Sequence, residues 1–268
     1  MKDYPAIDVR GPADDRLMAM LDDLAPTAID ERDDSLRVFF SSSGDRDRAR
    51  AALAEHFSVA AIEVPDEDWA RRSQADLKPI TVGRITVFPS LQSLVPSPCA
   101  IVIAPSMGFG TGHHATTRLC LAALQTIDLS GRTVLDVGTG SGLLAIAADR
   151  LGAARAIGID NDADAIQSAR ENLSLNPDAR RVIFEVSDLR ETPLPAADVV
   201  TANLTGALLV RAAHDLLAPL RRGGTLIVSG VLAEERDDVV AALGSAVGID
   251  ILWERTEDGW AGLAVKKL

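Results

Sequence analysis

The stretch VLDVGTGSGLLAIAA most restricts how this chain can fold. It begins with an apolar run that is typical of a buried strand. The run leads into Gly138, Gly140 and Gly142, and a helical pattern follows at once. Glycine is favoured where φ is positive or where a ligand approaches the backbone closely. A strand that passes through such a loop into a helix is typical of an α/β fold with a parallel sheet.

The alternation of helices and apolar strands continues along the chain from residue 113. The predicted strands are 133–137, 154–160, 181–186, 197–203 and 225–230. The predicted helices are 113–127, 142–151, 162–175, 206–219 and 233–245. Beyond residue 248, two extended runs flank Asp258-Gly259, a dipeptide typical of hairpin turns. We therefore expect an α/β domain with a mostly parallel seven-stranded sheet that ends in an antiparallel hairpin.

The first 65 residues form a different pattern. Predicted strands at 6–10, 28–31, 36–40 and 58–64 are separated by predicted helices at 14–24 and 45–57. The order βαββαβ is that of a ferredoxin-like α+β domain. We expect this domain at 1–65, a linker at 66–80, and the larger domain at 81–268, which opens with short strands around Gly83 and at 99–106.

The net charge of the chain indicates which kinds of partner it can bind. The chain has 27 basic and 39 acidic residues, a net charge of −12, and residues 1–65 are acidic too. A surface that binds phosphate backbones needs clustered Lys and Arg, so this composition disfavours direct nucleic-acid binding. There is no apolar segment typical of a signal peptide or membrane span, and we expect a cytoplasmic protein. Cys99 and Cys120 do not have the spacing of metal ligands, and we expect both to be buried as small hydrophobic side chains.

The spacing of the glycines distinguishes two classes of ligand. A dinucleotide fingerprint needs G-x-G-x-x-G, but the third position after Gly140 is Leu143. The observed G-x-G-x-G, preceded by Asp136 at the end of the strand, instead resembles the motif of S-adenosylmethionine-dependent methyltransferases. The alternative is a tight turn whose glycines serve backbone geometry only.

Two further carboxylates follow the next predicted strands. Asp160 lies 20 residues after Gly140, a spacing that suits hydrogen bonds to ribose hydroxyls. The alternative is that Asp160 caps the helix that begins near Asp162. Asp188 is placed to accept from an adenine amino group, beside Leu189, or it is a solvated loop carboxylate. Because the strands are parallel, these groups should share one sheet edge.

The block FGTGHHATTRLCL at 109–121 resembles the ribosomal protein L11 methyltransferases, the PrmA family. The resemblance extends over residues 65–268 and includes the glycine loop, GIDNDADAIQSARENLSLN, VTANLTGALL and GGTLIVSGVL. It implies a ferredoxin-like recognition domain followed by a class I, Rossmann-like methyltransferase domain. It also implies methyl transfer from S-adenosyl-L-methionine to lysine and N-terminal amines of a free large-subunit ribosomal protein by an enzyme that we expect to be a monomer.

The resemblance also assigns residues. Thr117, Gly138, Asp160 and Asn203 fall at cofactor-contacting positions, and Phe109 begins a loop over the methionine end. We expect the Asn203 side chain to accept hydrogen bonds from the reacting amine, a catalytic role, although Asn is also common in turns.

Capping by Thr116 or Thr117 is the alternative for Thr117. His113 and His114 are adjacent and no third ligand has metal spacing, so no metal site is expected.

Other functions stay open. The motifs assigned to cofactor binding say little about which molecule accepts the methyl group. Another protein lysine or a small molecule is therefore an alternative acceptor. A non-catalytic cofactor-binding module in ribosome assembly is a second alternative. A nicotinamide oxidoreductase is a third, disfavoured by Leu143.

Overall fold

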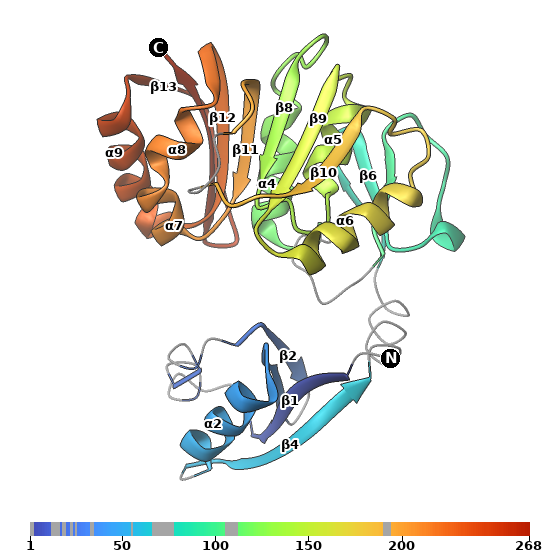
Figure 1. The fold of residues 1–268 in the computed structure, drawn as a ribbon, viewed down its shortest axis with the longest axis vertical. Coiled ribbons are helices and arrows are strands. Elements are labelled where there is room, and N and C mark those ends of the chain that lie inside the picture. Colours follow the sequence, from blue (N-terminus) through green and yellow to red (C-terminus); the bar gives the residue numbers. More distant parts are fainter. Residues whose placement is uncertain are drawn as a thin grey trace. The chain divides into compact units, whose positions relative to one another are not determined.

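The computed structural model describes residues 3–11, 17, 20–21, 24, 26–32, 35–54, 56–65, 78–104, 112–189 and 194–268. The chain forms two compact units, Met1–Asp76 and Leu77–Leu268 (Figure 1). Each unit has a buried apolar core of its own, as expected of separate domains. Most of the predicted linker lies outside the described residues. No helix in the described part of the chain is long and apolar enough to span a membrane.

The smaller unit is built on a four-stranded antiparallel sheet in the order β2-β3-β1-β4. Its elements are β1 (Asp3–Arg10), β2 (Ala28–Arg32), β3 (Ser35–Phe39), α2 (Ser43–Leu53) and β4 (Ser58–Pro65). Between β1 and β2, Leu17, Met20 and Leu21 are helical, while the rest of the predicted helix 14–24 falls largely outside the described residues. Leu17 and Leu21 are buried against β1 and α2 residues. The strand order confirms the predicted ferredoxin-like arrangement.

The larger unit contains a seven-stranded sheet in the order β10-β9-β8-β11-β12-β14-β13. Its strands are β8 (Thr133–Val137), β9 (Arg155–Asp160), β10 (Val182–Val186), β11 (Ala197–Asn203), β12 (Leu220–Leu232), β13 (Ile249–Glu257) and β14 (Trp260–Lys267). The first five in the sheet order are parallel, and β14 is antiparallel to both of its neighbours. The predicted mostly parallel sheet with its C-terminal hairpin is confirmed.

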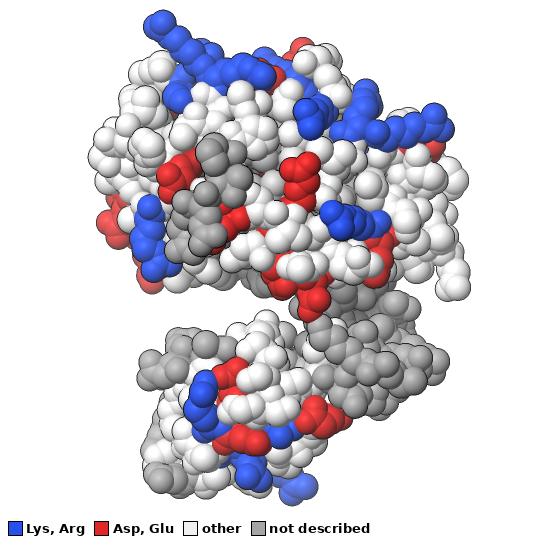
Figure 2. All heavy atoms as spheres, in the orientation of Figure 1, with Lys and Arg blue, Asp and Glu red and all other residues white. Residues whose placement is uncertain are grey.

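Charged side chains are distributed unevenly over this unit. Figure 2 shows Lys and Arg atoms along its upper edge and Asp and Glu atoms mainly below them. Arg155 opens β9 and Lys266 lies near the end of the antiparallel β14, so the upper edge is where the parallel strands begin. The carboxyl ends of the parallel strands lie at the opposite edge.

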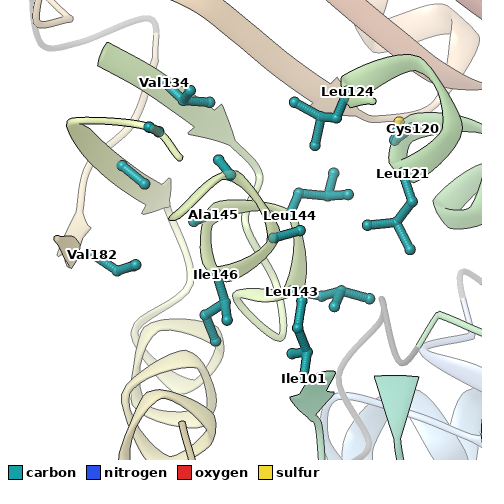
Figure 3. Packing of buried hydrophobic residues seen from close by; sticks show 14 of the residues in the cluster. Ile101, Cys120, Leu121, Leu124, Val134, Leu143, Leu144, Ala145, Ile146 and Val182 are labelled. Carbon is teal, nitrogen blue, oxygen red and sulfur yellow. The ribbon is translucent and has the colours of Figure 1, made fainter. Parts of the chain in front are cut away.

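Helices cover both faces of the seven-stranded sheet. One face carries α4 (Ala115–Leu124), α5 (Leu143–Arg150) and α6 (Ala163–Ser174); the other carries α7 (Gly206–Arg211), α8 (Ala213–Leu217) and α9 (Arg236–Ala246), the last preceded by the 3-10 turn η2 (Ala233–Glu235). Successive strand residues serve alternate faces, so Val134 packs with α4 and α5 while Leu135 packs with the other layer. Figure 3 shows Leu143 and Ile146 of α5 within the first cluster.

A small three-stranded sheet packs beside the α4 and α5 layer. Its elements are β5 (Ile80–Val82), β6 (Ile85–Phe88), the 3-10 turn η1 (Leu91–Ser93) and β7 (Ala100–Val102). Gly83, with φ of +58°, makes the tight turn between β5 and β6. β7 pairs in parallel with β6, and Ala104, two residues beyond its end, is joined to the glycine loop through Asn172.

Candidate active site

Four neighbouring parallel strands end at one edge of the large sheet. Asp188 follows β10, Asp160 ends β9, the glycine loop follows β8 and Asn203 ends β11. In open α/β sheets, ligands bind at this edge. The structure therefore brings these predicted residues to one place, whereas Phe109 lies outside the described residues.

The backbone of the glycine loop is shaped by three positive φ angles: +69° at Gly138, +52° at Gly140 and +82° at Gly142. The N–H groups of Gly138 and Thr139 both donate to the carbonyl of Ile159, at 2.9 Å each. A Cβ atom at Gly138 would lie 2.5 Å from Leu204 Cδ2. The loop thus folds tightly over the end of β9, with its backbone bare of side chains at these positions.

Asp136 lies beneath this loop and is almost completely buried. Its carboxylate accepts hydrogen bonds from Thr139 Oγ1 at 2.6 Å and Thr201 Oγ1 at 2.5 Å. Burial raises the pKa of Asp136 to about 6, although the two hydroxyls favour the charged form. Both carboxylate oxygens have protein partners, so Asp136 joins the loop to β11 from below.

Asp160 is half-buried and faces the loop. Its Oδ2 accepts from the N–H of Gly140 at 3.0 Å, and its Oδ1 accepts from the N–H of Asp162 at 3.1 Å. The cap of α6 is Asp162, which accepts from Asp164 N, so the interpretation of Asp160 as the helix cap is wrong. A carboxylate has about four acceptor sites, and Asp160 retains capacity for two ligand hydroxyls.

Thr117 and Asn203 meet although they are 86 residues apart in the sequence. Thr117 is buried in the first turn of α4, and Asn203 Nδ2 donates to its Oγ1 at 3.3 Å. This contact fixes the amide so that its carbonyl oxygen is available to a ligand donor. A polar pair is thereby placed next to the glycine loop.

His114, not a threonine, caps α4. Its Nδ1 accepts from the N–H of Thr116 at 3.4 Å, and its backbone carbonyl accepts from the N–H of Thr117 at 3.1 Å. The alternative, capping by Thr116 or Thr117, is wrong, and the first-turn N–H groups of these residues already have partners. Burial and the charge of Arg118 lower the pKa of His114, whose ring contacts Trp260 edge-to-face at 5.0 Å.

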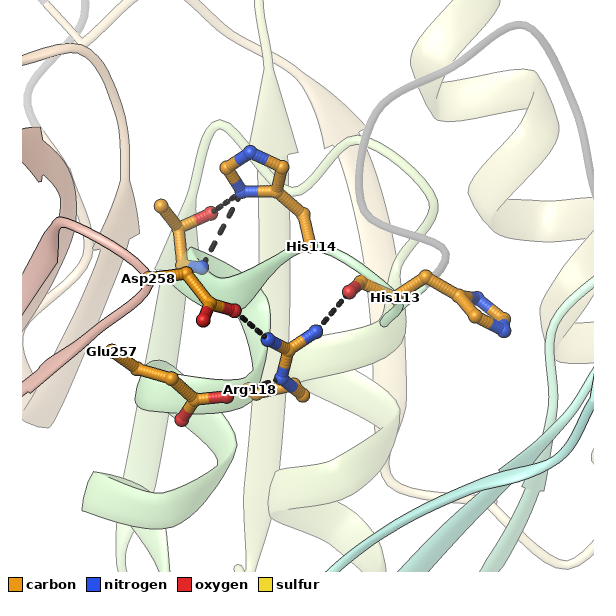
Figure 4. A network of polar contacts seen from close by, with 6 residues as sticks. His113, His114, Arg118, Glu257 and Asp258 are labelled. Carbon is orange, nitrogen blue, oxygen red and sulfur yellow. Dashed lines mark hydrogen bonds and ion pairs between the residues drawn. The ribbon is translucent and has the colours of Figure 1, made fainter.

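Arg118 ties the start of α4 to the turn between β13 and β14 (Figure 4). Its guanidinium donates to Glu257 Oε1 at 2.6 Å, to Asp258 Oδ2 at 2.8 Å and to the carbonyl of His113. Sequence reasoning missed this residue, because its carboxylate partners lie about 140 positions away. In the described part of the chain, no group of three or more His, Cys, Asp or Glu residues could hold a metal ion.

Sequence reasoning also missed two buried side-chain amides, Asn172 in α6 and Asn176 just after it. Asn172 Oδ1 accepts from the N–H of Ala104 at 3.0 Å, and its Nδ2 donates to the carbonyl of Ser141 at 2.9 Å. Asn176 pairs with both backbone groups of Val102, at 2.9 and 2.7 Å. Asn172 therefore joins the glycine loop to the segment that follows β7.

Asp188 is half-buried in the loop after β10, and the neighbouring Leu189 packs against the sheet core. Its position at the edge agrees with the predicted order of carboxylates along successive strands. Its proposed contact with adenine stays a prediction.

Comparisons with known proteins agree with this geometry. The family described as ribosomal protein L11 methyltransferase (PrmA) matches residues 26–268. The ribosomal protein L11 methyltransferase of Geobacter sulfurreducens is 40% identical over 267 residues, which cover 92% of this chain and 86% of that protein. That of Halalkalibacterium halodurans is 39% identical over 191 residues, or 70% of this chain, and the match spans only 61% of that relative's length.

A solved structure is also similar. The crystal structure of the ribosomal protein L11 methylase from Lactobacillus delbrueckii subsp. bulgaricus superimposes with a TM-score of 0.61 at 26% identity. The superposition covers 71% of this chain and 98% of that chain.

Proposed function

The chain belongs to the ribosomal protein L11 methyltransferase (PrmA) family, and from this premise we propose that it transfers methyl groups from S-adenosyl-L-methionine to amino groups of ribosomal protein L11. The acceptors are lysine side chains and the N-terminal amine. The enzyme acts as a monomer, in the cytoplasm, on the free ribosomal protein. The observation that carries the proposal is the contact between Thr117 and Asn203 at the same sheet edge as the glycine loop and Asp160.

The residues at this edge fit the cofactor. The glycines keep the loop bare, so a ligand can approach the backbone, and a Cβ at Gly138 would already collide with Leu204. Asp160 has acceptor capacity for ribose hydroxyls, and Asp188 is positioned to accept from the adenine amino group. Thr117 lies at the methionine end. Asp136 supports the loop from below through Thr139 and Thr201.

The reaction needs an amine with a free lone pair. When bound, the cofactor supplies a methyl group on a positively charged sulfur. A lysine amine with a pKa of ~10.4 is neutral only about once in 2,500 at pH 7. An adjacent carboxylate would raise the amine's pKa further, whereas a neutral amide does not. Asn203 therefore orients the neutral amine through its carbonyl oxygen, Thr117 fixes the amide, and water takes the proton.

The charge of the site edge suits a basic substrate. Asp162 and Glu234 are exposed just beyond the carboxyl ends of β9 and β12. A lysine-rich protein is attracted to such an edge over distances of about 10 Å at moderate salt.

The test is mass spectrometry of ribosomal protein L11 after incubation with the enzyme and methyl-labelled S-adenosylmethionine. We expect labelled lysines and a labelled N-terminus. In Asn203→Ala, turnover should fall by about 100-fold while the cofactor's dissociation constant, measured by calorimetry, changes by less than about 3-fold. Thr117→Ser should retain most turnover, and Thr117→Val should not.

Other outcomes favour other functions. Equal loss of turnover and cofactor affinity in Asn203→Ala would rule out the catalytic assignment. Label on a different protein or a small molecule would support a different acceptor. Cofactor binding without any product would indicate a non-catalytic module, and stabilisation by NAD alone would indicate an oxidoreductase.

A further inference from the structure

Five cations lie where the parallel strands of the large sheet begin, and we call them the basic edge. They are Arg132, Arg155, Arg180, Arg222 and Lys266. Strand pairing brings them together: Thr133 pairs with Arg155, the carbonyl of Arg181 accepts from Ala156, and Thr225 pairs with Lys266. Figure 2 shows the resulting row of basic atoms along the upper edge of the larger unit.

No ion pair joins the five cations of the basic edge to a carboxylate within the described part of the chain, although Asp128 and Asp198 lie near enough to Arg132 to be affected by its charge. The nearby carboxylates Asp149 and Asp198 pair with other arginines, Arg181 and Arg221, at 2.9 Å each. Asp178 lies 3.8 Å from Arg150.

Two exposed carboxylates lie beside the basic edge without an ion pair there. Asp128 lies in the turn before β8, and Asp250 is the cross-strand partner of Lys266. The local balance is 5 − 2 = +3, in a chain whose net charge is −12. The charge of this edge is therefore opposite in sign to the net charge of the chain.

We propose that the basic edge binds the phosphate backbone of RNA. The cations extend from β10 to β14, a row of six strands, which at about 4.8 Å per strand spans roughly 24 Å. An extended row fits a chain of phosphates better than a compact anion, which needs cations that converge. Four of the five are arginines, whose planar guanidinium matches phosphate oxygens in pairs.

The residues next to these cations favour RNA over an acidic protein. Gly131 precedes Arg132 and Gly223 follows Arg222, so at these two turns the neighbouring residue supplies no side chain that could anchor a protein partner; exposed aliphatic side chains lie at the Lys266 end, at Ile251 and Leu268. Protein interfaces depend on such anchors, whereas backbone binding of nucleic acid depends on exposed cations. This inference departs from the expectation drawn from net charge, because binding depends on where charges lie.

The basic edge and the candidate active site lie at opposite ends of the same strands. Asp160 ends β9, and Arg155 begins it. A strand of RNA on the basic edge would leave the glycine loop and Asn203 accessible. RNA binding and methyl transfer can therefore be tested independently.

The experiment is fluorescence anisotropy of a labelled 20-nucleotide uridine RNA titrated with the full chain at 50 to 200 mM NaCl. Each phosphate neutralised contributes about −0.7 to the slope of log K against log salt for single strands. Five contacts give a slope of about −3.5, so the affinity should fall about 100-fold over this range. Arg155→Gln/Arg180→Gln/Arg222→Gln should reduce the slope to about −1.4 and weaken binding at 50 mM.

The matched control is Arg10→Gln/Arg50→Gln/Arg255→Gln, which removes the same charge from exposed arginines elsewhere. It should leave the slope at the wild-type value. Both triple variants should bind S-adenosylhomocysteine with wild-type affinity, a check that they are folded. Equal weakening by the two triple variants, or no RNA binding at 50 mM NaCl, would overturn the proposal. So would a polyglutamate peptide that binds as tightly as the RNA, or dissociation of a self-assembled enzyme by the first triple variant.

Discussion

At the scale of single residues, the least expected feature is the position of Asp136. Its spacing before the glycines led us to expect a cofactor contact, but its two oxygens accept from Thr139 in the loop and Thr201 in the neighbouring strand. A carboxylate in such a buried position holds its partners firmly, at the cost of losing water around its charge. These hydrogen bonds tie the glycine loop to β11, and the contact of Asp136 with the cofactor stays a prediction.

Asp136 should make folding stability depend on pH. Its pKa of about 6 in the folded chain exceeds the ~3.9 of an unfolded Asp, so the folded state binds the proton more tightly. The stability that this group contributes is therefore full below pH ~4 and is lost as pH rises through 6, by about 3 kcal/mol. Asp136→Asn should lack this component. Urea unfolding followed by tryptophan fluorescence between pH 4 and 8 measures the difference.

Asp198→Asn provides a control of opposite sign. Burial opposes ionisation of Asp198, but hydrogen bonds from the N–H of Thr133 and from Arg221 outweigh it and lower its pKa. Its stabilisation is full above the unfolded pKa of ~3.9 and is lost only below it, so Asp198→Asn should keep the wild-type loss of stability between pH 4 and 8. If wild type and Asp136→Asn have parallel stability curves from pH 4 to 7, the buried carboxyl has no such role.

Residue identities were easier to predict than residue contacts. Thr117 and Asn203 came from motif resemblance, and the structure brings them within 3.3 Å. The two alternative interpretations as helix caps, for Asp160 and for Thr116 or Thr117, are both wrong, because capping depends on which side chain reaches the first N–H groups in an extended backbone. His114 does so at φ −72° and ψ 142°, and a histidine in that role has no strong sequence signal.

At the scale of elements, periodicity predicted the buried strands well. The ends of β8 and β11 agree with the prediction to the residue, because each has an apolar centre bounded by turn-forming residues, Gly131 and Gly138 around β8 and Pro195 and Asn203 around β11. The predicted helix 206–219 is instead α7 and α8, which meet at Ala212. An apolar stripe continues through this break, so hydropathy alone does not reveal it.

The observed start of β12 also differs from the predicted one, and here the cause is a bulge. It begins at Leu220, not residue 225, since Leu220 pairs with Ala197 before a bulge, and regular pairing resumes between Thr225 and Val199. Such a bulge depends on the neighbouring strand, which local sequence does not describe.

Asn172 should prove to be a positioning residue for the glycine loop. Asn172→Leu leaves the N–H of Ala104 and the carbonyl of Ser141 without their partner in a buried site. We expect a loss of stability of about 2–4 kcal/mol and a cofactor affinity reduced about 10-fold. Chemical unfolding and calorimetry with S-adenosylhomocysteine measure the two effects.

Gln167→Leu is the matched control for that substitution, because Gln167 is exposed on the same helix. Its stability should stay within about 0.5 kcal/mol of wild type. An Asn172→Leu variant that binds the cofactor with unchanged affinity would contradict the positioning role.

At the scale of the whole molecule, composition and distribution of charge have different consequences. The net charge of −12 is a single number, but the larger unit has acidic groups at the strand ends and basic groups where the strands begin. Composition alone does not reveal this separation, since it requires knowing which turns share an edge. The fold class, by contrast, follows from the order of strands and helices.

Attraction of a basic substrate to the acidic edge should make catalysis depend on salt. We expect kcat/KM for ribosomal protein L11 to fall about 10-fold between 50 and 300 mM NaCl, with kcat nearly constant, because screening slows encounter. Glu234→Gln should lower kcat/KM at low salt and weaken the dependence. Steady-state kinetics against a salt series measures this, and a salt-independent kcat/KM would contradict it.

The place of β14 in the sheet has a consequence for how the protein is made. β14 follows β13 in the chain, yet it lies between β12 and β13, and its turn carries the partners of Arg118. On a translating ribosome, β13 therefore emerges with no neighbour to pair with until residues 260–267 have followed. The large sheet is therefore completed late in synthesis. The contacts of Arg118 with Glu257 and Asp258, which hold the start of α4, form only then. A nascent chain stopped before Trp260 would carry the whole glycine loop, Asp160 and Asn203, but without β14 nothing would hold Glu257 and Asp258 beside Arg118.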